Sequence, residues 1–408
     1  MSDDNLSEAV SRRKLLLTGG IGASSALAGC FGGNGGNGNG DDGSGTSGGG
    51  DNGDTGGNGG SGPETFEVGH GDYRTTVSAE DFPDELFIYA VQTGWSNWDA
   101  VMDAFEEEYG VPLRDDQRTS GEALADIRSN AGNQDYSAYN GFYPTGLQAW
   151  DDGFTTDYQP AGWDQVPDDF KTDDNHVTAT RQMTIAINYR RDVYEDRGVD
   201  EPETWEDLKQ PEIAQDLAIN VPGAGAGLNA MLSINHAYGG DLDNLDPLID
   251  YLEEIGESGA RHQRNLDRQF TAGEISTYAE FDFGGLSTKY NDDDIPQEDV
   301  GVVIPQAPGG GEGAVAAPYG FAMLDGAPNP EACKLFMDFV LSLEVQQLFF
   351  DGFVRPIRAE ELDAPDEFPP DEQYEAATFE IDQVELLEKQ EDIVEEIIDR
   401  SPLPGVEA

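Results

Sequence analysis

Residues 217–237 read LAINVPGAGAGLNAMLSINHA: an apolar strand, a glycine-rich turn and a helix that begins at Leu228. A strand that passes through glycines into a helix is the repeating unit of α/β sheets. The same alternation continues along the chain from residue 86. Further apolar strands are predicted at 86–91, 184–189, 275–278, 300–304 and 318–324. The sequence therefore predicts an α/β fold with mostly parallel strands.

Helices are predicted between these strands from capping residues and apolar spacing. One is capped by Ser96 or Asn97 and runs to Tyr109. Another opens at residues 119–122, with Thr119 or Ser120 as its cap, and runs through Ile127. Others are predicted at 228–237, 330–341 and 343–350. The acidic tail after Ala376 carries apolar residues at helical spacing, so it is predicted to pack on the body through one face.

The N-terminal residues have the pattern of an export signal. An apolar run at residues 15–28 follows Arg12 and Arg13, and it is too short for a comfortable membrane span. The arginine pair resembles a twin-arginine signal. The run ends in LAGC, which resembles a lipobox, and in lipoproteins that cysteine carries the lipid. We therefore expect residues 1–30 to be a twin-arginine lipoprotein signal that leaves a lipid on Cys30.

The segment that follows the signal has an unusual composition. Residues 31–63 are almost wholly Gly, Asn, Asp, Ser and Thr. Such a segment buries too little apolar surface to offset its ordering entropy, so it is predicted to be a flexible linker. About 345 residues remain after it, which exceeds a usual single core and favours two lobes.

The charge of the chain is strongly negative. It holds 82 acidic and 22 basic residues, for a formal net charge of −60. Nucleic acid is not expected as a partner, because phosphate binding needs a basic surface. The acids are spread along the whole chain, which favours a solvated acidic shell of the halophilic kind over an acidic ligand surface. With the signal, this pattern suggests the surface of a salt-loving archaeon.

Cysteine and histidine give no sign of a metal or cofactor. If Cys30 carries a lipid, Cys333 is left without a disulfide partner, and its apolar neighbours predict a buried thiol. The four histidines show no metal-ligand spacing, so no metal or cofactor is predicted.

Four further segments of the chain form a pattern when they are taken together. They are FEEEYGV at 105–111, PETWEDL at 202–208, FTAGEI at 270–275 and the stretch from APNPEA at 327 to Gln346. In this order and spacing they resemble the extracellular solute-binding proteins of ABC importers of the iron(III), polyamine and maltose type, although each segment alone is a weak signal. The resemblance implies two α/β lobes joined by a hinge, which close around a ligand in the cleft between them.

The resemblance also implies a division of the chain. Residues 64–408 form the solute-binding domain. Lobe I covers about 86–183 and 304–350, lobe II about 190–300, and acidic helices follow at 359–408. The chain crosses between the lobes near 184–189 and 300–305. The expected partners are a small solute, an ABC permease and the membrane that holds the lipid anchor. The protein is expected to be a monomer on the extracellular face.

Candidate ligand contacts lie in the loops after the strands, where open α/β sheets bind their ligands. They are Trp95, Ser120, Tyr143, Gly225, Tyr278, Glu280, Asp282 and Tyr319. The glycines at 223–227 either present backbone N–H groups to an anion or make a tight strand-to-helix connection. The aromatic residues of 278–283 either face the ligand or belong to the core. Alternation would put Tyr278, Glu280 and Asp282 on one face of a strand.

These residues favour an organic cation, such as a polyamine or a thiamine-like molecule, because carboxylates and aromatic faces both attract cations. The glycine-rich helix start instead favours an anion, such as a phosphonate or a phosphorylated metabolite. Iron(III) ranks third. Its binders in this family place two adjacent tyrosines shortly after the Gly-Glu pair, where this chain has Asp282 and Phe283.

Two other function classes are weighed against transport. A surface-anchored hydrolase would need paired carboxylates at a cleft or a nucleophile with its base. Acids are so abundant that carboxylate pairs carry no information, and the one nucleophile pattern, GTSGG at 45–49, lies in the linker without a strand or helix beside it. No catalytic residue is therefore expected, and we predict that the protein is not an enzyme. A sensory binding protein that docks on a signal transducer would share the same fold, so it stays open.

Overall fold

A computed structural model describes residues 64–90 and 96–406 of the chain. The export signal with Cys30, the predicted linker and Trp95 lie outside the described residues.

Lobe I is built on parallel strands that are each followed by a helix. The strands are β3 (Leu86–Ala90), β4 (Leu113–Gln117) and β5 (Ala138–Phe142), and the helices are α2 (Trp98–Tyr109), α3 (Ser120–Ser129) and α4 (Tyr143–Asp151). Strand β3 lies between the other two in register, with Ile88 opposite both Asp115 and Ala138. Helix α3 begins with a capping box, in which Thr119 accepts from the backbone of Glu122 and the Glu122 side chain accepts from Thr119.

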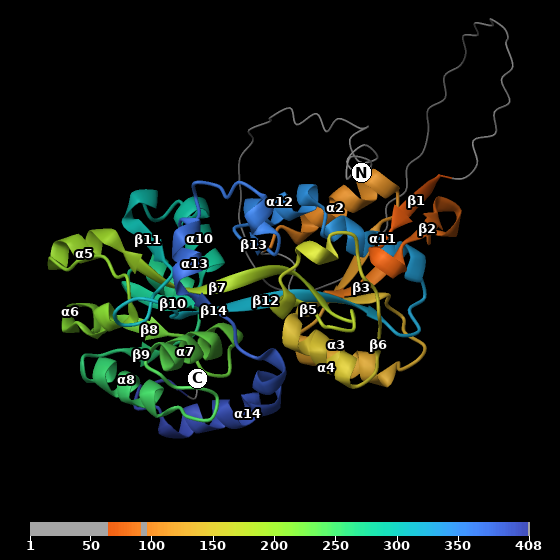
Figure 1. Cartoon of the computed structure of the whole chain (residues 1–408). Helices are drawn as coiled ribbons and strands as arrows, with labels where there is room; N and C mark the ends of the chain where they lie inside the picture. The colour runs from red at the N-terminus through yellow and green to blue at the C-terminus, as the bar shows by residue number, and fades with distance from the viewer. Residues whose placement is uncertain (1–63, 91–95, 407–408) are drawn as a thin grey trace, which may run out of the picture. The chain divides into compact units, whose positions relative to one another are not determined.

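Two long strands connect the lobes. They are β7 (Thr178–Arg190) and β12 (Ala314–Leu324), which pair antiparallel with each other. The first half of β7 pairs with β12, and its second half pairs with strands of lobe II. Figure 1 shows both strands running across the middle, between lobe I on the right and lobe II on the left. A hinge motion would therefore act through these strands.

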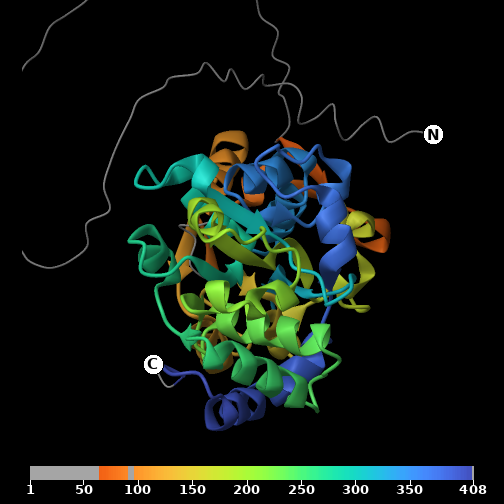
Figure 2. The same cartoon turned by 90° about the vertical axis from the view of Figure 1, so that its left-hand side faces the viewer.

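Lobe II packs helices on both faces of its strands. The strands are β8 (Leu217–Ile219), β9 (Arg261–His262), β10 (Thr277–Phe281) and β11 (Val300–Val303). The helices are α5 (Arg191–Arg197), α6 (Pro211–Ala214), α7 (Gly225–Ala237), α8 (Asp246–Glu257), α9 (Leu266–Thr271) and α10 (Asp282–Asn291). Figure 2 shows α7 and α8 in green on one face of the sheet and α10 in teal on the other.

The remaining elements complete lobe I and wrap around lobe II. The hairpin β1 (Thr65–Val68) and β2 (Thr75–Ser78), the short strand β6 (Thr155–Thr156) and the helices α11 (Pro330–Val340) and α12 (Leu343–Asp351) belong to lobe I. After them come β13 (Arg355–Pro356), α13 (Asp371–Ala377), β14 (Thr378–Phe379) and α14 (Gln383–Arg400).

We call residues 378–406 the C-terminal arm. Its strand β14 pairs with β12. Its helix α14 is held to lobe II by ion pairs of 2.6 Å from Lys389 to Asp243 and from Arg400 to Asp246. Figure 1 shows α14 in dark blue below α7 and α8.

Each lobe has its own apolar core. The lobe II core lies between β7 and α7 and includes Ile185, Ile187 and Met231, all nearly or fully buried. The lobe I core gathers around Trp98, Phe105 and Phe336. Cys333 is fully buried in this second core, as the sequence predicts, and burial raises the pKa of its thiol.

The structure confirms the two-lobed α/β fold but not a mostly parallel sheet. The crossing strands β7 and β12 run antiparallel to most of their neighbours, so the sheet is mixed. Strand β7 is also longer than the predicted 184–189, because its first residues pair with β12, which lies far away in the sequence. Helix α7 begins at Gly225 rather than Leu228.

No helix within the described residues is both long enough and apolar enough to cross a bilayer.

Candidate ligand-binding cleft

The strand ends of lobe II bring a pair of polar side chains together. Strands β8 and β10 are parallel neighbours, with Ile219 opposite Ala279, so their carboxyl ends lie at the same edge. Asn220 follows the first strand, and Glu280 lies near the end of the second. Asn220 forms a hydrogen bond with the Glu280 carboxyl, which favours its ionised form.

Glu280 nevertheless holds its proton to an unusually high pH. Burial raises its pKa to about 8, and the neighbouring Asp267 carboxyl adds to the shift. The pKa of Asp267 is also raised by loss of water, although Tyr278 donates a hydrogen bond of 2.8 Å to it. Within the described residues, no Lys or Arg forms an ion pair with either carboxyl. A cation bound beside the two acids would therefore favour their ionised forms.

Aromatic side chains lie where the lobes meet. Phe142 of lobe I, Phe283 of lobe II and Tyr319 of β12 are half-buried and pack against the lobe II core. The ring centroids of Phe142 and Tyr319 are 6.0 Å apart. Tyr319 also packs against the lobe I cluster around Tyr139.

Arg181 anchors the crossing strand β7 on the lobe I side. It is fully buried, and its Nη1 donates to Asn140 Oδ1 and Thr180 Oγ1, each at 3.2 Å. Its guanidinium lies 5.0 Å from the ring centroids of both Trp98 and Tyr319. Loss of water lowers the pKa of Arg181 to about 10. The positively charged guanidinium of Arg181 therefore lies behind the Tyr319 ring.

Three helices begin at strand ends that border this region. Helices α3, α4 and α7 follow β4, β5 and β8, so the predicted Ser120, Tyr143 and Gly225 are each the first residue of a helix. The glycines before α7 have two different surroundings. A Cβ on Gly227 would lie 2.1 Å from the Val221 carbonyl oxygen, so that glycine serves close strand-to-helix packing. Gly225 instead borders open space.

The predicted residues of 278–283 take different positions. Tyr278 and Glu280 share a face of β10, as alternation predicts, but Tyr278 is fully buried among Leu266, Phe270 and Ile295. The strand ends at Phe281, and Asp282 starts α10 instead of continuing the alternation. Asp282 is buried and accepts three hydrogen bonds from the protein itself. Whether the predicted residues contact ligand stays a prediction.

Sequence reasoning did not single out Asp267, Asn220 or Arg181. Asn220 is the first polar residue after an apolar strand, which is the position that the predicted loops share. Arg181 is a lone cation at the start of a long apolar strand. Asp267 lies in the first turn of α9, and only the fold brings it beside Glu280.

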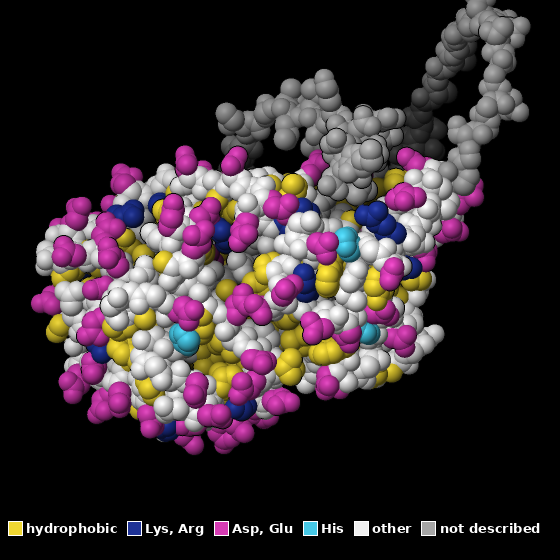
Figure 3. All heavy atoms as spheres, in the orientation of Figure 1, with side chains coloured by type: hydrophobic (Ala, Val, Ile, Leu, Met, Phe, Trp, Pro, Cys, Tyr) yellow, Lys and Arg dark blue, Asp and Glu magenta, His cyan; other side chains and the backbone are white. Residues whose placement is uncertain are grey.

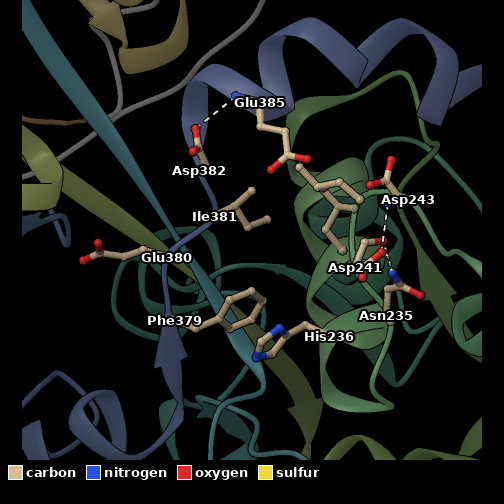
Figure 4. A pocket seen from close by; sticks show the side chains of 12 residues that line it. Asn235, His236, Asp241, Asp243, Phe379, Glu380, Ile381, Asp382 and Glu385 are labelled. Carbon is tan, nitrogen blue, oxygen red and sulfur yellow. Dashed lines mark hydrogen bonds between the residues drawn. The ribbon is translucent and has the colours of Figure 1, made fainter.

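Two pockets flank the C-terminal arm. One, of about 280 Å³, lies between α7 and the arm, and Figure 4 shows Phe379 beside His236 at this pocket, with Ile381 further along the arm. The other, of about 610 Å³, lies between α4 and the arm, and Tyr143 lines it. Figure 3 shows hydrophobic side chains in hollows on this face with carboxylates around them. Within the described residues, no three His, Cys, Asp or Glu side chains are arranged to hold a metal ion.

The two-lobed fold and a family match together define the class: a solute-binding protein of the kind that serves ABC importers. Residues 144–382 match the family described as "Bacterial extracellular solute-binding protein", which is more than half of the chain. The chain belongs to this family. Its members bind small solutes and deliver them to a permease, and they are binding proteins rather than enzymes.

Comparison with individual proteins agrees with this assignment. An uncharacterized protein of Haemophilus influenzae is 26% identical over 254 residues, which are 60% of this chain and 69% of that protein. The periplasmic binding protein AfuA of Actinobacillus pleuropneumoniae, solved with fructose-6-phosphate, has a TM-score of 0.61 at 19% identity, covering 78% of this chain and 99% of its own. Iron-bound HitA of Pseudomonas aeruginosa has a TM-score of 0.62 at 16% identity, covering 76% and 99%. These two structures share the fold.

Proposed function

We propose that the protein captures a small organic cation in the cleft between its lobes and delivers it to the permease of an ABC importer, without catalysing a reaction. The observation that carries this proposal is the pair of carboxyls of Glu280 and Asp267. Burial raises the cost of ionising both side chains, and the Asp267 charge adds to that cost for Glu280. A ligand cation would remove this cost on binding.

The half-buried rings at the lobe interface support the same ligand class. A cation held by Glu280 would lie near the lobe II edge, beside the helix that carries Phe283. A ring face within reach of a cation contributes roughly 0.5 to 2 kcal/mol. A polyamine or a thiamine-like molecule combines the required charge with apolar carbon that can pack on such rings.

An anion such as a phosphorylated metabolite is the second candidate. It is favoured by the N-terminus of α7, where Gly225 borders open space, and by Arg181 behind Tyr319. AfuA, which shares the fold, was solved with a sugar phosphate. A molecule that carries both a cationic ring and a phosphate would satisfy both sets of groups. Iron(III) ranks below these, since Asp282 and Phe283 stand where an iron site of this family would place its tyrosine pair.

Ligand class is tested directly by calorimetry on the full chain in constant high KCl. Spermidine, thiamine, thiamine phosphate, glycerol 3-phosphate and ferric citrate form a suitable panel. We expect heat from the first three compounds and none from the last two. Mass spectrometry of small molecules released from the purified protein gives an independent identification. Binding of glycerol 3-phosphate without either cation would overturn the cation assignment and favour the anion.

We further propose that Cys30 anchors the protein to the outer face of the membrane. The motivating sequence is LAGC at residues 27–30, followed by a segment with the composition of a flexible tether. Cys30→Ala should move the protein from the membrane fraction to the medium, or leave it as an unprocessed precursor. A Cys333→Ala variant is the matched control, because Cys333 is buried in the core, and it should stay with membranes. Membrane-bound Cys30→Ala of mature size would refute the anchor.

The acidic composition supports a surface adapted to high salt, and the formal net charge of −60 argues against nucleic acid as a partner. The lobe boundaries, the monomeric state and the choice between a permease and a signal transducer stay predictions.

A further inference from the structure

The pocket of about 610 Å³ between α4 and the arm has a size in the usual range of small-molecule sites, which is roughly 300–1,000 Å³. We call it the α4–arm cavity. One wall is the side of α4 that carries Tyr143, Leu147 and Trp150. The opposite wall is the start of the arm at residues 380–384. Neither Glu280 nor Asp267 lines it, so this cavity is separate from the acids of the proposed cleft site.

Most charged groups around the α4–arm cavity already have protein partners. Asp382 caps α14 by accepting from the backbone N–H groups of Val384 and Glu385. Asp174 accepts from Trp150 Nε1 at 2.9 Å. The cation of this wall, Lys171, pairs with Asp168 at 3.0 Å.

Lys171 is also held in place on its other side. Its Nζ donates to the carbonyl oxygens of Val166 and Trp163 and lies 4.0 Å from the Trp163 ring centroid. It is therefore not available to the remaining carboxylates of the cavity, among them Asp169 and the exposed Asp173.

Glu380 and Asp169 differ from the charged groups above, because their two carboxyls contact each other. Glu380 of the arm forms a hydrogen bond with Asp169, which lies in the 3-10 turn Asp168–Phe170 of lobe I. Figure 4 shows the side chains of Glu380 and Ile381 pointing to opposite sides of the arm. Loss of water and the Asp169 charge raise the pKa of Glu380 to about 7, although its side chain remains accessible to solvent. Two carboxyls in contact require a proton or a cation between them.

We propose that the α4–arm cavity is a second binding site, for an organic cation with an apolar body whose charged group replaces the proton between Glu380 and Asp169. The carboxyls supply the charge partner, and the Trp150 and Tyr143 side chains supply the apolar and aromatic surface. A free metal ion would leave that apolar surface unused. The proposal does not depend on the ligand of the cleft.

The bound cation would also join two parts of the molecule. The arm is held to lobe II, where the Phe379 ring stacks on His236 at 3.7 Å and Ser401 hydrogen-bonds to His262 at 3.0 Å. Asp169 belongs to lobe I, before the crossing strand β7. A cation between Asp169 and Glu380 therefore bridges the lobes outside the cleft.

The test uses phenethylamine as the probe and Trp150 as the reporter. The full chain is labelled with 5-fluorotryptophan, the Trp150 resonance is assigned with Trp150→Phe, and the titration is run in constant high KCl. We expect the Trp150 resonance to shift saturably with phenethylamine and not with neutral 2-phenylethanol. Glu380→Gln and Asp169→Asn should each weaken the titration at least tenfold. Glu253→Gln, which removes an exposed acid on α8, should leave it unchanged.

Two results would overturn the second site. One is a Trp150 resonance that does not respond to phenethylamine, while the other resonances show a folded protein. The other is a response that is equal in Glu380→Gln and in Glu253→Gln. Loss of spermidine or thiamine binding at the cleft would leave the Trp150 titration in place, so this inference and the proposed function can fail separately.

Discussion

Glu280→Gln should remove both the pH dependence of ligand binding and most of the affinity for the organic cation. In the free protein the Glu280 carboxyl has a pKa of about 8, so at neutral pH a cation must displace a proton before it can pair with the carboxylate. Wild-type affinity should therefore rise by about tenfold from pH 7 to pH 9 and level off above that. The variant should bind about 10- to 100-fold more weakly at pH 9, which corresponds to about 1.5 to 3 kcal/mol for a lost charged hydrogen bond.

Proton release gives a second measurement of the same event. Calorimetry at pH 7 in two buffers of different ionisation enthalpy should show nearly one proton released per cation bound by wild type and none by Glu280→Gln. For an anionic ligand we expect the opposite pH dependence, because an anion should bind more tightly when Glu280 is protonated or replaced by glutamine. Affinity that falls as pH rises, or tighter binding in the variant, would contradict the cation assignment.

The same substitution should stabilise the protein without ligand. The pKa of Glu280 is raised in the fold, so the native state holds its proton where the unfolded chain has lost it, and stability falls as pH rises from about 4.5 to about 8. This loss of stability is absent below about pH 4.5 and complete above about pH 8. Glu280→Gln should therefore raise the free energy of unfolding at pH 9 by about 2 to 4 kcal/mol and leave it unchanged near pH 4.

Local pattern was enough to predict the α/β class and the position of several helices, while chain length and the family resemblance predicted the two lobes. Helix α3 begins at Ser120 with Thr119 as its cap, because the capping residues and the first turn are adjacent in sequence. The same local logic placed α7 at Leu228, whereas it begins at Gly225. Glycine composition favours a loop, but the approach of Gly227 to the end of β8 lets the helix start earlier.

Structural features that depend on contacts between residues far apart in the chain could not be predicted from the sequence. Strand β10 was predicted at 275–278 and lies at Thr277–Phe281, because its extent follows its pairing with the crossing strand β7. That shift places Glu280 inside a strand. Asp267 could not be predicted as its neighbour, since α9 reaches β10 only in the folded lobe. The sequence therefore allowed candidate polar residues to be chosen from their positions at strand ends. It did not allow the neighbouring side chain that shifts the pKa of such a residue to be predicted.

Asp282→Ala should lower the free energy of unfolding by about 3 to 5 kcal/mol, the opposite of the effect expected at Glu280. Asp282 Oδ1 accepts from the backbone N–H groups of Thr184 and Phe283 at 3.1 and 3.0 Å, and Oδ2 accepts from the Tyr374 hydroxyl at 2.8 Å. The residue thus joins α10 to the crossing strand β7 and to α13. Alanine would leave two buried donors and the half-buried N–H of Phe283 without an acceptor.

Asp282→Asn is the informative companion, since its amide oxygen can keep both backbone bonds and its nitrogen can donate to Tyr374. Burial raises the pKa of Asp282 to about 6, so ionisation costs stability as pH rises from about 4 to about 6, and the neutral amide avoids this cost. Chemical unfolding at pH 8 should therefore find Asp282→Asn within about 1 kcal/mol of wild type. Because its oxygens are already bonded within the protein, cation affinity should also change less than threefold. A tenfold loss of affinity at unchanged stability would instead show that Asp282 contacts the ligand, as its position after β10 first suggested.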